Sequence, residues 1–159
     1  MEDPYTRLDI VRCTPGPTAQ AVRELIAGPF LDKDADENAD DVTDEDLVGG
    51  FTSYTLDVEE VADLFQELAT VGGDLALQLR TEHETGEPGM LFAYAAGTGR
   101  FQAPCDRSGQ VLVPADRLAA LAACRSPKRR AALAEELTGR RVLDALREEP
   151  APASDRRKH

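Results

Sequence analysis

Asp74-Leu-Ala-Leu-Gln-Leu-Arg-Thr81 begins the stretch that decides the fold, which runs to Pro114. In this segment Leu75, Leu77 and Leu79 alternate with smaller or polar residues. Successive side chains of a strand point to opposite faces, so a period of two predicts a β-strand with one face in a core.

Three further strands are expected in the same stretch. Met90-Leu-Phe-Ala-Tyr-Ala95 is apolar on both faces, which predicts a central strand covered on both sides. Phe101–Cys105 is shorter, and Pro104 lacks an N–H to donate, so we expect this strand either to lie at a sheet edge or to end at Pro104. Gln110–Val113 is expected to be the fourth. Short turns join antiparallel neighbours, so residues 74–114 are predicted to form a meander.

Two strands and two helices are expected before the meander. Tyr5–Cys13 and Phe51–Leu56 have strand-like composition. A helix is expected from Thr18, whose hydroxyl suits an N-cap, to Ala27, and a second helix begins after Asp57. The second helix carries a stripe of apolar residues at helical spacing, which indicates core packing. The stripe consists of Val58, Val61, Leu64, Phe65 and Leu68.

Three helices are expected in residues 115–148. Ser126 suits an N-cap and Pro127 the first helical position, while Gly139 ends the middle helix. The side chains expected to face the core are Leu118, Leu121 and Ala122 in the first helix, Leu133 and Leu137 in the second, and Val142, Leu143 and Leu146 in the third. Residues 149–159 are expected to be a disordered tail.

Together these elements predict one α+β domain over residues 1–148. We expect a mainly antiparallel sheet of five or six strands, with helices packed on one face and a C-terminal helical hairpin. With 159 residues, the chain buries roughly 70% of its unfolded surface, enough for a core without staples. The sequence shows neither a membrane-span-length apolar run nor a signal-peptide pattern, so we expect a cytoplasmic protein and no membrane partner.

Charge is unevenly distributed along the chain. The net charge is −12, but residues 1–124 carry 24 acidic and 8 basic residues, or −16. Residues 125–159 carry 6 acidic and 10 basic residues, or +4. The acidic part repels nucleic acid and attracts basic proteins.

An acidic loop is expected at residues 31–46, where nine of the fifteen residues from Asp32 to Asp46 are acidic. Part of it has the spacing of an EF-hand calcium loop, with candidate oxygen ligands at positions 1, 3, 5, 7 and 12. These residues are Asp34, Asp36, Asn38, Asp40 and Glu45. Ala39 stands where the sharp turn needs Gly, and helices do not flank the loop well. We therefore assign no metal and no cofactor.

The leading hypothesis is an acidic protein-interaction module that binds a basic protein partner, such as an inhibitor, an immunity-type protein or a regulatory adaptor. Two acidic segments supply the candidate partner-binding residues. In the loop these are Asp34, Asp36, Asp40 and Asp41, and on the helix after Asp57 they are Glu59, Glu60, Asp63 and Glu67. A homodimer remains an alternative, because an edge strand near Pro104 offers backbone groups to a second copy.

The main alternative is a DNA-binding regulator. Residues 126–147 resemble a helix-turn-helix, with Gly139 near the turn. The candidate nucleic-acid contacts are Arg129, Arg130, Arg140 and Arg141. Acidic neighbours dilute this basic footprint, so nucleic acid ranks below a protein partner.

An enzyme of unknown type is the third alternative. The histidines are His83 and His159, and neither has a local Ser or Cys partner in the sequence. Three widely spaced cysteines, Cys13, Cys105 and Cys124, fit neither a disulfide scaffold nor a zinc site. We assign no catalytic residue and favour a non-enzymatic role.

Overall fold

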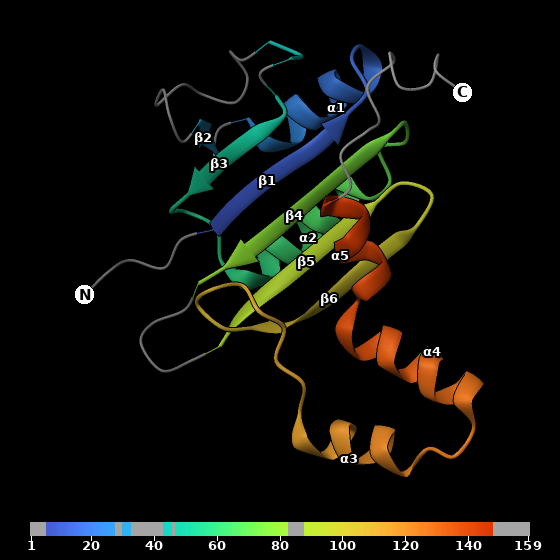
Figure 1. Cartoon of the computed structure of the whole chain (residues 1–159). Coiled ribbons are helices and arrows are strands. Elements are labelled where there is room, and N and C mark those ends of the chain that lie inside the picture. The colour runs from blue at the N-terminus through green and yellow to red at the C-terminus, as the bar shows by residue number, and fades with distance from the viewer. Residues whose placement is uncertain (1–5, 28–29, 33–42, 46, 83–87, 148–159) are drawn as a thin grey trace, which may run out of the picture.

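The computed structural model describes residues 6–27, 30–32, 43–45, 47–82 and 88–147. Its centre is an antiparallel sheet with the strand order β2-β3-β1-β4-β5-β6 (Figure 1). The strands are β1 (Thr6–Cys13), β2 (Leu31–Asp32), β3 (Gly49–Ser53), β4 (Leu75–Thr81), β5 (Gly89–Ala95) and β6 (Gly99–Cys105). The helices are α1 (Pro17–Ile26), α2 (Val58–Leu68), α3 (Ala115–Ala123), α4 (Pro127–Thr138) and α5 (Arg140–Arg147). The predicted α+β class is confirmed.

β4, β5 and β6 form the predicted antiparallel meander. Leu79 of β4 pairs with Phe92 of β5, and Met90 of β5 pairs with Pro104 of β6. Leu91 and Phe92 point to opposite faces and are both buried, which confirms that β5 is covered on both sides. β6 forms an edge of the sheet, as Pro104 predicted.

The predicted strand at Gln110–Val113 is wrong. Within the described residues, this segment pairs with the sheet through a single β-bridge, between Val111 and Cys105. The cause is the turn before it, where the Asp106 carboxylate accepts hydrogen bonds from two backbone N–H groups, both at 2.9 Å. This tight turn redirects the chain, which then leaves the sheet for α3.

α1 and α2 cover one face of the sheet, behind the strands in Figure 1. Phe65 of α2 lies against Phe92 of β5, with ring centroids 5.3 Å apart. The Asp57 carboxylate accepts a hydrogen bond from the Glu60 N–H at 2.8 Å, which confirms the predicted N-cap. The core under these helices includes Leu8, Ile10, Val22, Ile26, Phe51, Val61, Leu64, Leu68, Leu75, Leu77 and Leu79.

The predicted N-cap of α1 is wrong. The helix begins at Pro17 after Gly16, and no side chain caps it. Proline suits the first helical position because its fixed φ fits the helix and its missing N–H needs no partner. Thr18 therefore lies inside the first turn, and its hydroxyl donates to the Gly72 carbonyl at 3.4 Å instead.

α5 packs on the opposite face, over β4, β5 and β6 (Figure 1). Val142 and Leu146 are buried there, which confirms two of the three predicted contacts. The strands meet the helix with small residues, and the cluster consists of Ala76, Ala93, Ala95, Phe101, Ala103, Val142 and Leu146. Gly139 begins this contact with a φ of +59°, and a Cβ there would stand 2.2 Å from Cγ of Phe101.

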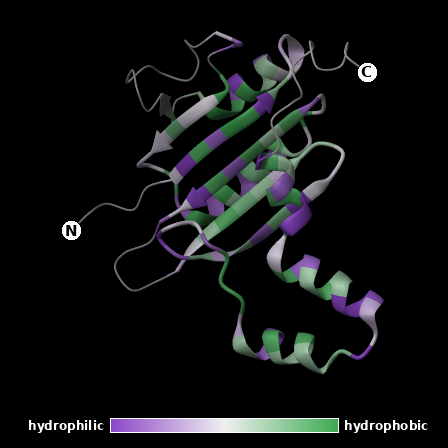
Figure 2. Cartoon of the chain, in the orientation of Figure 1, coloured by the Kyte–Doolittle hydropathy of each residue, from purple (hydrophilic) through white to green (hydrophobic). Residues whose placement is uncertain are grey.

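α3 and α4 project away from the sheet as a helical hairpin, which we call the arm (Figure 1). Figure 2 shows apolar residues along α3, yet neither α3 nor α4 contains a buried residue. Leu118 was predicted to face the core but is 55% exposed. Ala122 is exposed as well, and Leu121, Leu133 and Leu137 are half-buried rather than buried. The prediction failed because α3 packs mainly against α4, and α4 meets the sheet mainly at the edge strand β6.

Candidate interaction surfaces

The four acidic residues predicted on α2 share its exposed side. Val61, Leu64, Phe65 and Leu68 hold the other side in the core. Since a helix repeats every 3.6 residues, this burial turns the remaining positions toward solvent. The acidic face of α2 consists of Glu59, Glu60, Asp63 and Glu67, and all four are exposed.

The acidic face of α2 stabilises the helix at its N-terminal end but not toward its C-terminal end. Glu59 and Glu60 lie in the first turn, where a negative charge complements the helix dipole. Asp63 follows Glu59 by four residues and precedes Glu67 by four, and like charges at this spacing repel. Glu67 also lies near the C-terminal end, where a cation is preferred. Hydrogen bonding to Asp57 and the charge of Asp57 raise the pKa of Glu60.

Most of the predicted site residues of the acidic loop lie outside the described residues. Asp34, Asp36, Asn38, Asp40 and Asp41 lie outside the described residues, so their predicted roles stay predictions. Glu45, the last residue of the EF-hand-like spacing, is exposed.

Asp44, beside that spacing, has a structural role. Its carboxylate accepts a hydrogen bond from the Gly16 N–H at 3.0 Å and forms an ion pair with Arg23 of α1. These two contacts attach the end of the acidic loop to both ends of α1, because Gly16 precedes its first residue and Arg23 lies in its last turn. Asp44 is therefore occupied within the chain.

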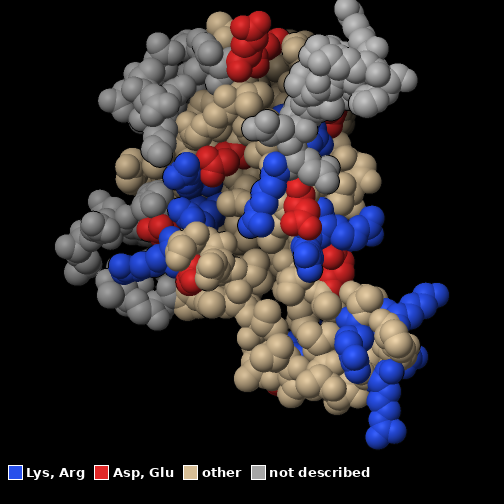
Figure 3. Space-filling view, in the orientation of Figure 1, with Lys and Arg blue, Asp and Glu red and all other residues tan. Residues whose placement is uncertain are grey.

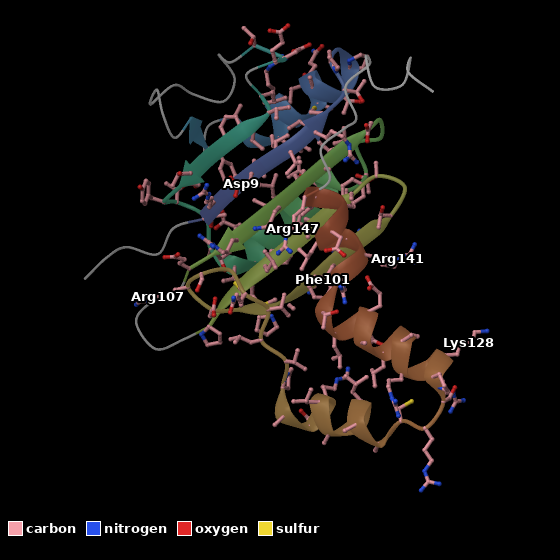
Figure 4. The ribbon with its side chains drawn as sticks, viewed as in Figure 1. Asp9, Phe101, Arg107, Lys128, Arg141 and Arg147 are labelled. Atoms are coloured by element: carbon pink, nitrogen blue, oxygen red, sulfur yellow. The ribbon has the colours of Figure 1, made fainter. Side chains whose placement is uncertain are left out.

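The opposite charge gathers on the arm. Figure 3 shows Lys and Arg side chains projecting from this part of the molecule, and Figure 4 labels Lys128 near the end of α4 that lies farthest from the sheet. We call the exposed cations around the α3–α4 turn the basic tip, and they are Arg125, Lys128, Arg129 and Arg130. The Arg130 Nε donates to the Cys124 carbonyl at 3.1 Å, so this side chain also closes the turn between α3 and α4.

The four arginines proposed for nucleic acid do not form one surface. Arg129 and Arg130 lie in the first turn of α4, whereas Arg140 and Arg141 follow its last turn. Twelve helical residues span about 18 Å, which separates the pairs. Arg140 also forms an ion pair with Asp144 at 3.6 Å.

The α4–α5 connection also differs from a helix-turn-helix. Gly139 alone separates the two helices, whereas that motif uses a turn of three to four residues. The Glu135 carboxylate accepts from the Arg141 N–H at 2.9 Å and so caps the start of α5. One side of α5 is occupied by the sheet, because Val142 and Leu146 are buried. The DNA-binding alternative remains a prediction without geometric support from this junction.

Two open hollows flank the α4–α5 junction. The smaller is about 370 Å³ and includes Arg100, Glu135 and Arg141 in its lining. The larger is about 880 Å³ and lies between α4, α5 and the turn after β6, with Arg140 and Arg147 among its residues. Neither His nor Cys occurs among the residues described as lining them. The larger hollow offers the hydroxyl groups of Ser108 and Thr138 beside its charged groups.

Burial shifts the pKa values of two cysteines within the described chain. Burial raises the pKa of Cys105, an effect that the nearby Arg80 partly opposes. Burial also raises the pKa of Cys13. His83 lies outside the described residues. Across the described residues, no group of three or more His, Cys, Asp or Glu side chains is placed to hold a metal ion.

Sequence reasoning did not single out Arg80, whose side chain is 16% exposed on the α5 face of the sheet. Its Nε is buried and has no hydrogen-bond partner among the described atoms, and Glu82 approaches its guanidinium only to 3.9 Å. Alternation along β4 was the available signal, since it places Arg80 on the face opposite Leu79. The charged residues around it are of both signs, so it does not define a site.

No protein-family model, curated protein or solved structure matches this chain. Within the described residues, none of the helices has the length and apolar character needed to cross a membrane. Two charged surfaces stand out among the described residues, the acidic face of α2 and the basic tip of the arm.

Proposed function

We propose that this protein is an interaction module that binds a basic protein partner through the acidic face of α2. The supporting observation is four exposed carboxylates on a helix whose other side is fixed in the core. A preorganised charged surface loses little conformational freedom when a partner binds. Inhibitors, immunity-type proteins and regulatory adaptors use surfaces of this kind without chemistry of their own.

The row formed by Glu59, Asp63 and Glu67 sets the spacing that we expect for basic residues on the partner. Residues four apart stack along one side of a helix, and this row spans about 12 Å at 1.5 Å per residue. A partner that carries Lys or Arg at a similar spacing would relieve the repulsion within the row. Complementary charge of this sort raises the association rate and makes binding sensitive to salt.

The experiment is affinity capture from nuclease-treated lysate of the source cell, at low salt, with three baits. One bait is the wild type, and the second is the triple variant Glu59→Lys, Asp63→Lys and Glu67→Lys. The control bait is Glu24→Lys, Asp116→Lys and Glu136→Lys, which makes the same change in net charge at exposed acids away from α2.

We expect a protein that binds the wild type and the control but not the α2 variant, and that elutes at about 0.5 M salt. The proposal fails if the α2 variant retains the same proteins as the wild type, or if bound proteins resist that salt.

The exposed basic tip is the observation that keeps DNA binding as a second candidate function. Because the two arginine pairs lie at opposite ends of α4, they can be tested separately. If duplex DNA is the ligand, Arg129→Glu with Arg130→Glu should weaken duplex binding more than Arg140→Glu with Arg141→Glu, since Arg140 already pairs with Asp144. Equal retention of the duplex by the wild type and both variants would exclude this candidate.

A further inference from the structure

The outer edge of β6 carries backbone groups that the described chain leaves unpaired. At one end of the strand the Pro104 carbonyl accepts a hydrogen bond from the Leu112 N–H at 2.8 Å, so the backbone of Pro104 points away from β5. This direction alternates from one residue of a strand to the next, so the backbone groups of Gln102 and Arg100 also point outward. No described residue outside β6 forms a hydrogen bond with them there.

A hollow of about 370 Å³ lies beside this unpaired stretch of the edge. One wall is the strand from Thr98 to Gln102, and the other is the junction of α4 and α5, including Gly139, Arg141 and Val142. Figure 1 shows β6 as the outermost strand, next to this junction. An open strand edge that faces a helical wall suits an extended peptide, which can extend the sheet by one strand.

We propose that an extended segment of a partner protein binds in this hollow and pairs antiparallel with β6 at Arg100 and Gln102. Both residues have an outward N–H and an outward C=O, and a residue directly opposite such a pair of groups can bond to both of them. Main-chain hydrogen bonds of this kind provide affinity, while the side chains of the segment provide specificity.

The helices beside the edge favour a single segment over a second copy of this chain. Neighbouring strands lie about 4.8 Å apart, so a second sheet would place its next strand about 10 Å from β6. α4 packs against β6 and extends outward on that side of the sheet (Figure 1). A lone segment needs only the first of these two positions, which the hollow leaves open.

The two faces of β6 define the side chains of the segment. Arg100 donates a hydrogen bond to Gln66 of α2, so its side chain lies on the α2 face. Phe101 packs with Val142 on the α5 face, and both line the hollow. No ion pair joins Arg100 to a described acid, so acidic side chains are favoured on the α2 face. An apolar side chain is favoured opposite Phe101.

The carboxylates that line the hollow belong to its helical wall. Glu135 and Glu136 are residues of α4, and Glu135 accepts a hydrogen bond from the Arg141 N–H. Acidic side chains on the α2 face would point away from this wall, because successive side chains of a strand alternate between faces. The segment should therefore alternate acidic and apolar residues.

A titration of the ¹⁵N-labelled full chain with the peptide acetyl-Thr-Glu-Val-Glu-Thr-amide tests the proposal by NMR. We expect a dissociation constant of about 0.1–1 mM, with the largest amide shifts at Arg100 and Gln102. The same peptide N-methylated at both glutamates lacks the two donors and should bind at least about tenfold more weakly. No shift at about 5 mM peptide, or equal binding of the methylated peptide, would overturn the proposal. So would shifts of these amides that grow with protein concentration alone, which would indicate self-pairing.

Gln102→Pro removes the outward donor from the protein itself. Pro104 already occupies an outward position in the same strand, so a second proline there leaves the bonds to β5 in place. We expect Gln102→Pro to weaken peptide binding at least about tenfold, while the control Gln102→Ala keeps its N–H and binds as the wild type does. Unchanged binding by Gln102→Pro would overturn the proposal, and the methylated peptide decides the question if this variant does not fold.

The acidic character of the segment has its own control. The peptide acetyl-Thr-Lys-Val-Lys-Thr-amide keeps every backbone donor but places cations beside Arg100, so it should bind more weakly than the glutamate peptide. Equal binding of the two peptides would overturn the preference for acidic residues. The acidic face of α2 is unchanged in both Gln102 variants, so these outcomes are separate from the proposed partner binding.

Discussion

α2 and α3 have similar sequence patterns but very different surroundings. Both are amphipathic, and both carry leucines at helical spacing. α2 buries four of its apolar residues against the sheet, whereas α3 buries none. The difference shows that periodicity identifies which face of a helix needs covering, but not which surface covers it. α2 can therefore present a fixed acidic face, while α3 presents apolar residues that the described chain does not bury.

The largest difference in stability is expected when one leucine of α2 and one leucine of α3 are each replaced by alanine. Leu68 of α2 is fully buried and Leu118 of α3 is 55% exposed. We expect Leu68→Ala to lower the free energy of unfolding by about 2–5 kcal/mol, because it removes buried methyl groups and leaves a cavity. Leu118→Ala should change it by no more than about 0.5 kcal/mol. Urea denaturation at low protein concentration measures both, and equal losses would contradict the difference between the regions.

The junction between arm and body should be nearly as sensitive. Gly139→Ala places a Cβ 2.2 Å from Cγ of Phe101 at a backbone φ of +59°. A left-handed conformation alone costs a residue with a Cβ about 1–2 kcal/mol. We expect a total loss of about 2–4 kcal/mol, because the clash with a buried ring adds to this cost.

Gly97→Ala is the matched control for the junction. Gly97 also has a positive φ, +83°, but a Cβ there meets nothing within 4 Å. It should therefore show the backbone cost without the clash. If thermal denaturation gives the same loss for both variants, Gly139 does not fix α5 on the sheet through Phe101.

Removal of the N-cap should affect the whole fold in α2 but only the local helix in α4. Asp57 caps α2 at 2.8 Å, and Ser126 caps α4 at 3.3 Å. Loss of a cap costs about 0.5–2 kcal/mol. We expect Asp57→Ala to lower global stability by about 1 kcal/mol. Ser126→Ala should instead reduce helical content in α4 while the unfolding midpoint of the body stays the same. Hydrogen exchange read by NMR distinguishes the two, and a lower global midpoint for Ser126→Ala would show that the arm folds with the body.

The smallest effect should be a gain in stability. Glu67→Lys removes repulsion with Asp63, creates an attractive pair four residues apart, and places a cation near the C-terminal end of α2. We expect the free energy of unfolding to rise by about 0.3–1 kcal/mol, while affinity for a basic partner falls. A destabilised variant would mean that the acidic face of α2 serves the fold rather than a partner.

Patterns local to one element predicted most of the sheet and the core. Alternation at Leu75, Leu77 and Leu79 identified β4, and Pro104 identified the edge strand. The stripe on α2 also predicted its acidic exposed side, because burying one face of a helix fixes the other.

Features set by long-range geometry could not be predicted in the same way. Leu118 has the spacing of a core residue, but its burial depends on where the sheet ends. Thr18 has the chemistry of a cap, yet the preceding proline starts the helix. The basic tip and the acidic face of α2 were visible as charges, but their separation onto different parts of the molecule depends on the tertiary fold.

The most direct test is hydrogen–deuterium exchange of α2 and α3 in the wild type. The account predicts protected amides in α2, because its apolar side is buried in the core. In α3 it predicts faster exchange than in α2, because α3 contains no buried residue. Amides of α3 as protected as those of α2 would contradict the account, since the arm would then be as stable as the body.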